Sequence, residues 1–230
     1  TSEKAASFLD NVSAVVHHGV DIQKFTPAVS RKAAIQRLGF PFKYAIGQFG
    51  RVRPEKGADY FVKAMIELLP QYPDFGAVLV GKVTAGFERF SNDLQASVKA
   101  AGLENRIVWH GEVPFDQVPA VYNAMSFVVA PSRYEGFGLT PLEAMASGAP
   151  VIAADTGAYA AMIDPGTNGH IFPVHDTDKF KEYLQRLMSD PEALLSMSDD
   201  CQRLVQEKFS IEKEVRGIAD VYRRLWDTKS

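Results

Sequence analysis

Short apolar segments without alternation of apolar and polar residues are the feature that most restricts the fold of this chain. Between them, apolar residues recur three or four positions apart, as in GADYFVKAMIELLP. A strand that is apolar on both faces is typical of a parallel sheet covered by helices on both sides. The alternation of these two patterns predicts an α/β fold with a Rossmann-like, doubly wound parallel sheet and helices on both faces. The predicted strands are residues 44–50, 76–81, 106–111, 126–132, 150–155 and 170–174.

The two ends of the chain carry further expectations. Near the amino end, residues 14–19 (AVVHHG) predict a short buried strand. From Asp176 to about Asp227 the pattern is helical, with breaks near Pro191 and Ser210. We expect Asp176 to cap the first of these helices rather than to bind a metal.

Composition limits the class of protein. The 230 residues are 46% hydrophobic and 23% charged, with a formal net charge of -3. These values are typical of a globular protein with a sizeable core and argue against a general nucleic-acid binder. The single cysteine, Cys201, excludes an intrachain disulfide and a cysteine-built metal site. The sequence contains neither a membrane-length apolar run nor a signal peptide, so we expect a cytoplasmic protein. Because it begins at Thr1 rather than methionine, we also expect an excised piece of a longer protein.

Ligands of such sheets bind beyond the carboxyl ends of the strands, so the loops after the strands are the candidate sites. The loop in GQFGRVRPEKG (47–57) places Arg51, Arg53 and Lys56 within six residues. Each cation alone is consistent with a solvated loop. Together they can clamp a diphosphate, because arginine offers planar bidentate contacts and lysine a point charge. Arg53 can equally be a bystander that faces solvent.

The segment SRYEGFGLTPLEAMASGAPV (132–151) allows two interpretations. Thr140, Pro141 and Glu143 fit a capping box, with threonine at the N-cap and glutamate three residues later, and this needs no ligand. Alternatively, the glycine-containing loop exposes backbone N–H groups beside the positive end of a helix, which favours an anion. Glu135 lies in the loop without an evident capping role, so it is the stronger candidate for chemistry.

A third candidate is RIVWHGEVP (106–114), where a strand end beside Trp109 offers a backbone edge for a flat base. His110 alone, like His17 and His18, is more readily a structural histidine than a catalytic one. The histidines lack metal-ligand spacing. The chain contains neither a G-x-S-x-G nucleophile elbow nor a G-x-x-x-x-G-K-[ST] phosphate loop.

Taken together, these motifs resemble the retaining glycosyltransferases of the two-domain GT-B architecture. The run EGFGLTPLEAMASGAPVIAADTGAYAAMI…GTNGHIFP carries two glutamates separated by seven residues, which mark the donor site in that family. GRVRPEKG is similar to the phosphate-clamp strand end of the family, and HHGVDIQKFTP to its interdomain segment. The resemblance covers essentially the whole chain and is strongest to bacterial lipopolysaccharide-core mannosyltransferases.

The resemblance implies roles for the matching residues. Glu135 would hydrogen-bond the transferred sugar, and Glu143 would hold the ribose hydroxyls. Arg51 and Lys56 would neutralise the diphosphate, which leaves as a nucleoside diphosphate. Glu135, Arg51 and Lys56 are thus the implied catalytic residues, and no metal is implied. The backbone of Phe137, Gly138, Leu139 and Thr140 would meet the sugar and the diphosphate, and residues around Val108, Gly111 and Val113 would line the nucleobase pocket. The implied donor-binding residues also include Gly50 and Glu143.

The resemblance also implies a division into domains. A complete enzyme of this family has an N-terminal domain of similar size, which binds the acceptor and usually contributes a histidine near the reacting carbon. Residues 1–21 would then be an interdomain connector, 22–208 the donor-binding domain, and 209–230 a helix that packs toward the N-terminal domain. The isolated chain is expected to bind donor weakly and to turn over little or nothing. The side chains expected to be partly exposed on the last helix are Tyr222, Leu225 and Trp226.

The implied donor is GDP-mannose, with no cofactor, for retaining transfer of mannose. The implied partner is a lipopolysaccharide-core or other glycan acceptor, with peripheral contact at the inner face of the inner membrane. A UDP- or ADP-sugar is the close alternative, because the base is poorly encoded in this segment. A non-catalytic nucleotide-sugar-binding module is disfavoured by the joint retention of Arg51, Lys56, Glu135 and Glu143. A doubly wound oxidoreductase is disfavoured because no G-x-G-x-x-G follows an early strand.

Overall fold

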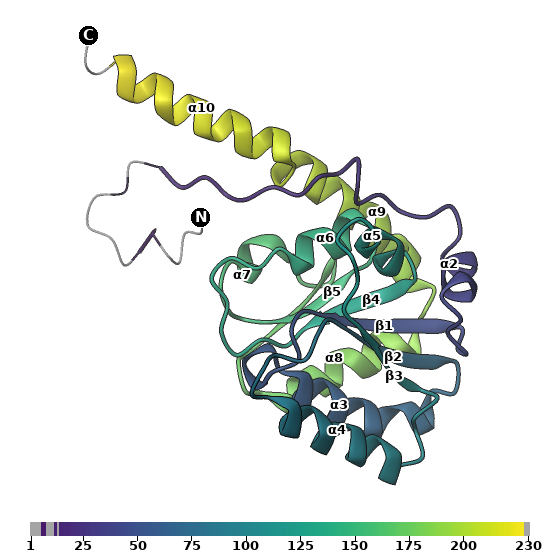
Figure 1. Ribbon diagram of the computed structural model, residues 1–230. Coiled ribbons are helices and arrows are strands. Elements are labelled where there is room, and N and C mark those ends of the chain that lie inside the picture. The colour runs from purple at the N-terminus through teal and green to yellow at the C-terminus, as the bar shows by residue number, and fades with distance from the viewer. Residues whose placement is uncertain (1–5, 8–11, 13, 228–230) are drawn as a thin grey trace.

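A single parallel sheet forms the centre of the structure, a computed structural model that describes residues 6, 7, 12 and 14–227. Its six strands lie in the order β3-β2-β1-β4-β5-β6, and every neighbouring pair is parallel (Figure 1). The predicted fold class is confirmed. The strands are β1 (Tyr44–Phe49), β2 (Phe75–Val80), β3 (Ile107–Gly111), β4 (Met125–Ala130), β5 (Val151–Ala154) and β6 (Gly169–Phe172).

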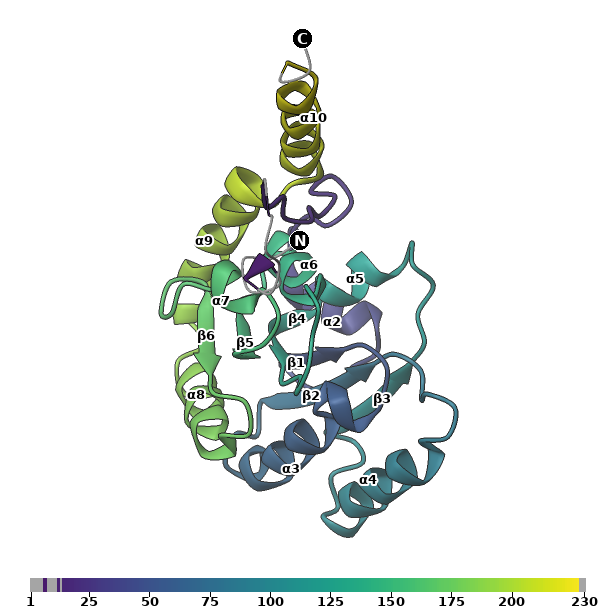
Figure 2. The ribbon, with the colours of Figure 1, turned by 90° about the vertical axis from the view of Figure 1, so that its left-hand side faces the viewer.

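Helices cover both faces of this sheet (Figures 1 and 2). Every residue of β2 and of β4 is buried, which explains why these strands are apolar throughout. A separate hydrophobic cluster lies on each face, and α9 (Ala193–Lys208) contributes to both. The helices of one face are α2 (Arg31–Arg37), α5 (Val118–Tyr122), α6 (Thr140–Ala146) and α7 (Tyr159–Met162). Those of the other face are α3 (Ala58–Leu68), α4 (Glu88–Ala100) and α8 (Thr177–Ser189).

The direction in which strands are added reverses at β1. The chain builds outward from β1 through β2 and β3, then returns to add β4, β5 and β6 on the other side. At such a switch point the loops that leave the two central strands diverge and create a crevice. These loops are residues 50–57 after β1 and 131–139 after β4. They carry Arg51, Lys56 and Glu135, so the topology brings the predicted catalytic residues to one edge of the sheet.

The strand predicted at residues 14–19 is wrong. These residues belong to no strand, and the neighbouring Val20 makes an isolated bridge with Ser210. The segment instead contacts α10 (Ile211–Asp227), where a Cβ at Gly217 would sit 3.0 Å from Val16 Cγ1. Val16 therefore packs on a helix, and a short apolar run cannot by itself distinguish that environment from a sheet.

The carboxyl end is helical, as predicted, with breaks at Pro191 and Ser210 between α8, α9 and α10. Asp176 caps α8, because its Oδ1 accepts the Lys179 N–H at 2.9 Å. None of the helices among the described residues is long and apolar enough to cross a membrane.

The last helix, α10, begins at Ile211, two residues after the expected boundary, and projects away from the sheet (Figure 1). Residues 1–5, 8–11 and 13 of the expected connector lie outside the described residues, as do 228–230 of the last segment. The side chains expected to be exposed on α10 are exposed, and they are Tyr222, Leu225 and Trp226.

Candidate functional site

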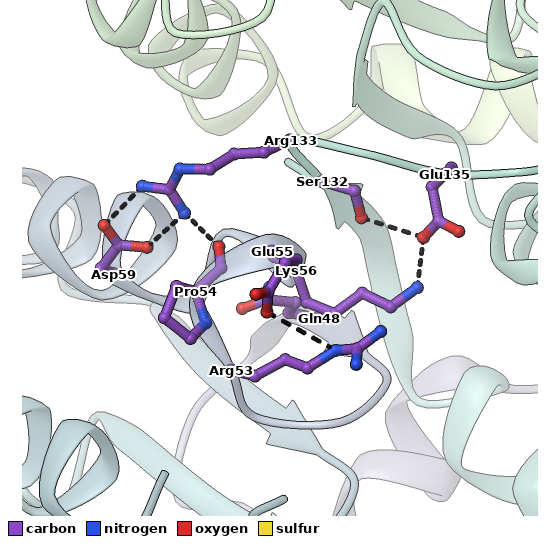
Figure 3. Close-up of polar contacts among 9 residues, drawn as sticks. All are labelled: Gln48, Arg53, Pro54, Glu55, Lys56, Asp59, Ser132, Arg133 and Glu135. Carbon is purple, nitrogen blue, oxygen red and sulfur yellow. Dashed lines mark hydrogen bonds and ion pairs between the residues drawn. The ribbon is translucent and has the colours of Figure 1, made fainter.

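An arginine clamp joins the two loops at the switch point. Arg133 donates hydrogen bonds to both Asp59 carboxylate oxygens, at 2.9 and 2.7 Å, and another to the Pro54 carbonyl (Figure 3). Its backbone N–H bonds the Glu55 carbonyl at 2.8 Å. Its guanidinium carbon lies 3.8 Å from the centre of the Tyr60 ring. One side chain from the loop after β4 thus holds the loop after β1 in place.

The clamped loops bring Lys56 and Glu135 into direct contact. Lys56 Nζ donates to Glu135 Oε1, and Ser132 Oγ donates to the same oxygen at 3.0 Å (Figure 3). The Glu135 N–H in turn bonds Thr156 Oγ1 at 3.2 Å. The Lys56 and Glu135 side chains are 23% and 12% exposed, so solvent screens their attraction less than that of a surface pair. Two residues 79 positions apart, predicted to share a site, do lie together.

Tyr159 of α7 lies against the Glu135 loop. Burial, together with the nearby Glu135 carboxylate, raises the pKa of the Tyr159 hydroxyl well above its usual value, so the hydroxyl keeps its proton. The ring also leaves no room for a side chain at position 138, because a Cβ there would sit 2.4 Å from Tyr159 Cε1. Gly138 has φ +82°, and glycine is the residue that tolerates both the close ring and this backbone.

A groove of about 390 Å³ opens beside the Lys56–Glu135 pair, which is a volume typical of small-molecule sites. Phe49 and Tyr122 stack with ring centres 3.8 Å apart on its wall. Gly50, which lines the groove, lies next to Lys56: a Cβ on Gly50 would sit 3.8 Å from Lys56 Cδ. The groove is lined by Phe49, Gly50, Arg51, Val80, Gly81, Lys82, Glu112, Val113, Phe115, Val118, Tyr122, Thr140 and Glu143.

Glu143 faces this groove, so the capping-box prediction is wrong. α6 begins at Thr140 itself, which makes Leu139 the N-cap, and no side chain caps the helix. The Glu143 carboxylate instead accepts a hydrogen bond from Tyr122 Oη at 2.8 Å. A buried tyrosine hydroxyl needs an acceptor, and this contact supplies it. Burial raises the pKa of Glu143, although Tyr122 and the nearby Lys24 oppose the rise.

The other predicted donor-binding residues are distributed around the site. Those that line the groove with Glu143 are Gly50, Val113 and Thr140, and the predicted catalytic residue Arg51 lines it as well. Gly111 ends β3 with φ +80°, next to the groove residue Glu112. Val108 lies in the middle of β3 and lines a different hollow beside α4, away from the groove. The Phe137 side chain is buried in the core, whereas Leu139 is exposed.

Several groove residues were not found from the sequence. Tyr122, which holds Glu143, comes from the short helix α5. Lys24 Nζ lies 3.5 Å from the centre of the ring of Phe115, which lines the groove, so it places a cation next to a groove residue. No local motif marks these residues, because long-range packing alone brings them to the groove. Arg53, the third cation of the loop after β1, pairs with Glu55, and its Nε lies 3.7 Å from Glu55 Oε2.

This arrangement suits a phosphorylated sugar. Arg51 and Lys56 can neutralise phosphate oxygens, while the Glu135 and Glu143 carboxylates can accept hydrogen bonds from hydroxyl groups. Among the described residues, no cluster of three or more histidine, cysteine, aspartate or glutamate side chains could hold a metal ion.

The six-stranded parallel sheet with this switch-point groove is the C-terminal domain of a GT-B glycosyltransferase architecture. The family model described as glycosyl transferases group 1 matches residues 31–204. The chain belongs to this family.

Comparison with individual proteins agrees with that assignment. The lipopolysaccharide core biosynthesis mannosyltransferase LpcC of Rhizobium leguminosarum bv. viciae is 42% identical over 225 residues, which are 98% of this chain and 63% of that protein. The crystal structure of the C-terminal domain of a group 1 family protein (LpcC) from Francisella tularensis is 37% identical, with a TM-score of 0.78 over 84% of this chain and 100% of that chain. Anabaena Alr3699/HepE, solved in complex with UDP-glucose, is 25% identical, with a TM-score of 0.81 over 92% of this chain and 57% of that chain. This chain therefore spans 63% of the length of the Rhizobium relative.

Proposed function

We propose that this chain is the donor-binding domain of a retaining mannosyltransferase that takes mannose from GDP-mannose and adds it to a lipopolysaccharide core. The observation that carries the proposal is the contact of Lys56 with Glu135 beside a groove that holds Arg51 and Glu143. Cations for a diphosphate and carboxylates for hydroxyl groups thus lie at one switch point. The 42% identity to a lipopolysaccharide core mannosyltransferase supports the choice of sugar and acceptor.

The proposed chemistry uses fixed charge. When the bond between the anomeric carbon and the donor phosphate breaks, its electron pair goes to the leaving diphosphate. Arg51 and Lys56 would stabilise that developing charge in place of a metal ion. The acceptor hydroxyl would attack from the face that the diphosphate leaves, through an oxocarbenium-like state, and its proton would pass to the departing diphosphate oxygen. Loss of one such cation should slow transfer by about a hundredfold or more.

Glu135 provides the sharpest test of the site. In Glu135→Ala, binding of GDP-mannose should weaken strongly, because the sugar hydroxyls lose the carboxylate that accepts their hydrogen bonds. Binding of GDP should hold or tighten, since Lys56 is released toward the diphosphate. Titration calorimetry with both ligands measures the difference, and Glu67→Ala, which breaks the exposed Lys181–Glu67 pair of 3.0 Å on the α3–α8 face, is the matched control. Equal loss of both ligands in Glu135→Ala would mean that Glu135 holds the nucleotide or the fold instead.

A UDP-sugar is the second candidate donor, because the structural relative HepE is solved with UDP-glucose. Calorimetry of the chain with GDP, UDP and ADP separates the candidates. The proposal expects GDP to bind most tightly. A clear preference for UDP would replace GDP-mannose by a UDP-sugar while leaving the site in place.

We further propose that an N-terminal domain of the full enzyme binds the acceptor; this chain covers 63% of the length of the Rhizobium relative, which is compatible with a further domain. In the full enzyme that domain would face a lipid-linked acceptor at the cytoplasmic side of the inner membrane. The 230 residues alone should then bind donor weakly and transfer little or no mannose. A radiolabelled transfer assay tests this, and robust turnover by the 230-residue chain would contradict it.

A further inference from the structure

The connector is tied to the first turns of α10 by backbone and side-chain hydrogen bonds. The Val20 N–H bonds the Phe209 carbonyl at 2.8 Å, and the Ile211 N–H bonds the Val20 carbonyl at 3.1 Å. Gly19 lies so close that a Cβ there would sit 2.3 Å from the Ser210 carbonyl oxygen. In Figure 1 the purple connector passes the base of α10, where that helix leaves the body of the domain.

Glu214 completes this junction from the first turn of α10. Its Oε2 accepts the Gly19 N–H at 2.9 Å, and its Oε1 lies 2.8 Å from His18 Nδ1. Burial alone would raise the pKa of Glu214, but the bonds from Gly19 and His18 outweigh burial and lower it. The carboxylate is therefore ionised and can only accept, so His18 Nδ1 carries the shared proton.

The His18 ring also contacts the loop that carries Glu135 (residues 131–139). His18 and Phe137 meet edge to face, with ring centres 5.0 Å apart and planes at 88°. His17 adds a second ring contact to Phe137 at 6.1 Å and one to Phe209 at 5.6 Å. Edge-to-face aromatic pairs are directional, so a shift of one ring displaces the other.

Phe137 is two residues from Glu135 in the same short loop. The Phe137 ring is buried, so it cannot turn away freely when His18 moves. On its far side the Phe137 carbonyl accepts the Ala158 N–H at 3.4 Å, one residue before Tyr159, which lies against Glu135. The loop is thus held between the connector and α7, with Glu135 at its centre.

We infer that His18 is a positioning residue, which transmits the placement of the connector and α10 through Phe137 to the Glu135 loop. Both segments that lead out of this domain meet at His18 and Glu214, so any movement of one against the other reaches the Glu135 loop through this contact. This inference rests on the proposed function in one respect: its binding test uses GDP-mannose as the donor.

Substitutions at His18 separate its two contacts. His18→Asn keeps an N–H donor for Glu214 but removes the ring, whereas His18→Phe keeps a ring for Phe137 but removes the donor. Glu214→Ala removes both bonds from the α10 side at little cost to the helix, because alanine is a strong helix former. Asp220→Ala is the matched control, since Asp220 lies on the same helix and pairs at 2.6 Å with the exposed Arg223.

Two measurements on the 230-residue chain test the inference. Calorimetry should show GDP-mannose binding weakened about two- to tenfold in His18→Asn, His18→Phe and Glu214→Ala, with GDP binding unchanged. In a 4-fluorophenylalanine-labelled chain, with the Phe137 resonance assigned from Phe137→Leu, Glu214→Ala should shift that resonance, although the bonds that Glu214 loses go to Gly19 and His18. Asp220→Ala should change neither readout.

The outcomes separate this inference from the proposed function. If the wild-type chain binds no nucleotide sugar, the proposed function fails, while the fluorine shift still decides the coupling. An unmoved Phe137 resonance in Glu214→Ala overturns the inference whatever the ligand. Equal weakening of GDP and GDP-mannose also overturns it, because that result indicates general loss of structure rather than displacement of the sugar-binding loop.

Discussion

Arg133→Ala tests whether the clamp is what holds the site loops in register. The substitution removes both bonds to Asp59, the bond to the Pro54 carbonyl and the stacking on Tyr60. It leaves the Asp59 carboxylate 18% exposed without its cation. Removing one partner of a fully buried ion pair costs about 3–5 kcal/mol. Because Arg133 itself is 23% exposed, water screens and partly solvates the remaining charge, and we expect a loss of about 2–3 kcal/mol.

Urea unfolding measures this loss directly. With a denaturant slope of about 2–3 kcal/mol per molar, the midpoint should fall by about 1 M. Arg223→Ala is the matched control, because the Arg223–Asp220 pair is as short, at 2.6 Å, but the side chains are 73% and 54% exposed. That substitution should cost less than about 1 kcal/mol.

A double variant distinguishes burial from attraction. Arg133→Met together with Asp59→Leu removes both charges, so it should recover much of the stability lost in Arg133→Ala. If Arg133→Ala costs no more than Arg223→Ala, the reasoning that burial gives the clamp its importance is refuted.

Three further predictions concern individual buried contacts. Burial raises the pKa of Glu143, so the native state keeps a proton there after the unfolded chain has lost its own, and stability falls as pH rises from about 4.5 through the raised pKa. Glu143→Gln keeps an acceptor for Tyr122 and should stabilise the domain at pH 7 in urea unfolding, with no difference below pH 4.5. Gly57→Ala should lower stability by more than about 2 kcal/mol, because Gly57 has φ +71° and a Cβ would sit 2.0 Å from the Pro131 carbonyl oxygen; a neutral result in the same assay would contradict that geometry. Cys201 is fully buried, and burial raises the pKa of its thiol, so a colorimetric thiol reagent should label it only on unfolding.

The fold, and the edge of the sheet at which the candidate residues gather, could be predicted because both depend on local pattern. Continuous apolar runs such as residues 76–81 required a sheet covered on both faces, and β2 is buried at every residue. In a parallel sheet all carboxyl ends lie at one edge, so the loops that carry Arg51 and Glu135 had to lie at the same edge. The same local reasoning failed for residues 14–19, which form no strand and place Val16 against α10 rather than in the sheet.

The sequence by itself therefore determined the parallel sheet and the loops that bring Arg51, Lys56 and Glu135 to one edge of it. Only the tertiary structure decided what each charged group contacts. Glu143 bonds Tyr122 rather than its own helix end, and Arg133 reaches Asp59 across 74 positions. The physical reason is that periodicity reports which face of an element is buried, whereas a hydrogen-bond partner is selected by whichever donor or acceptor packing leaves within about 3 Å.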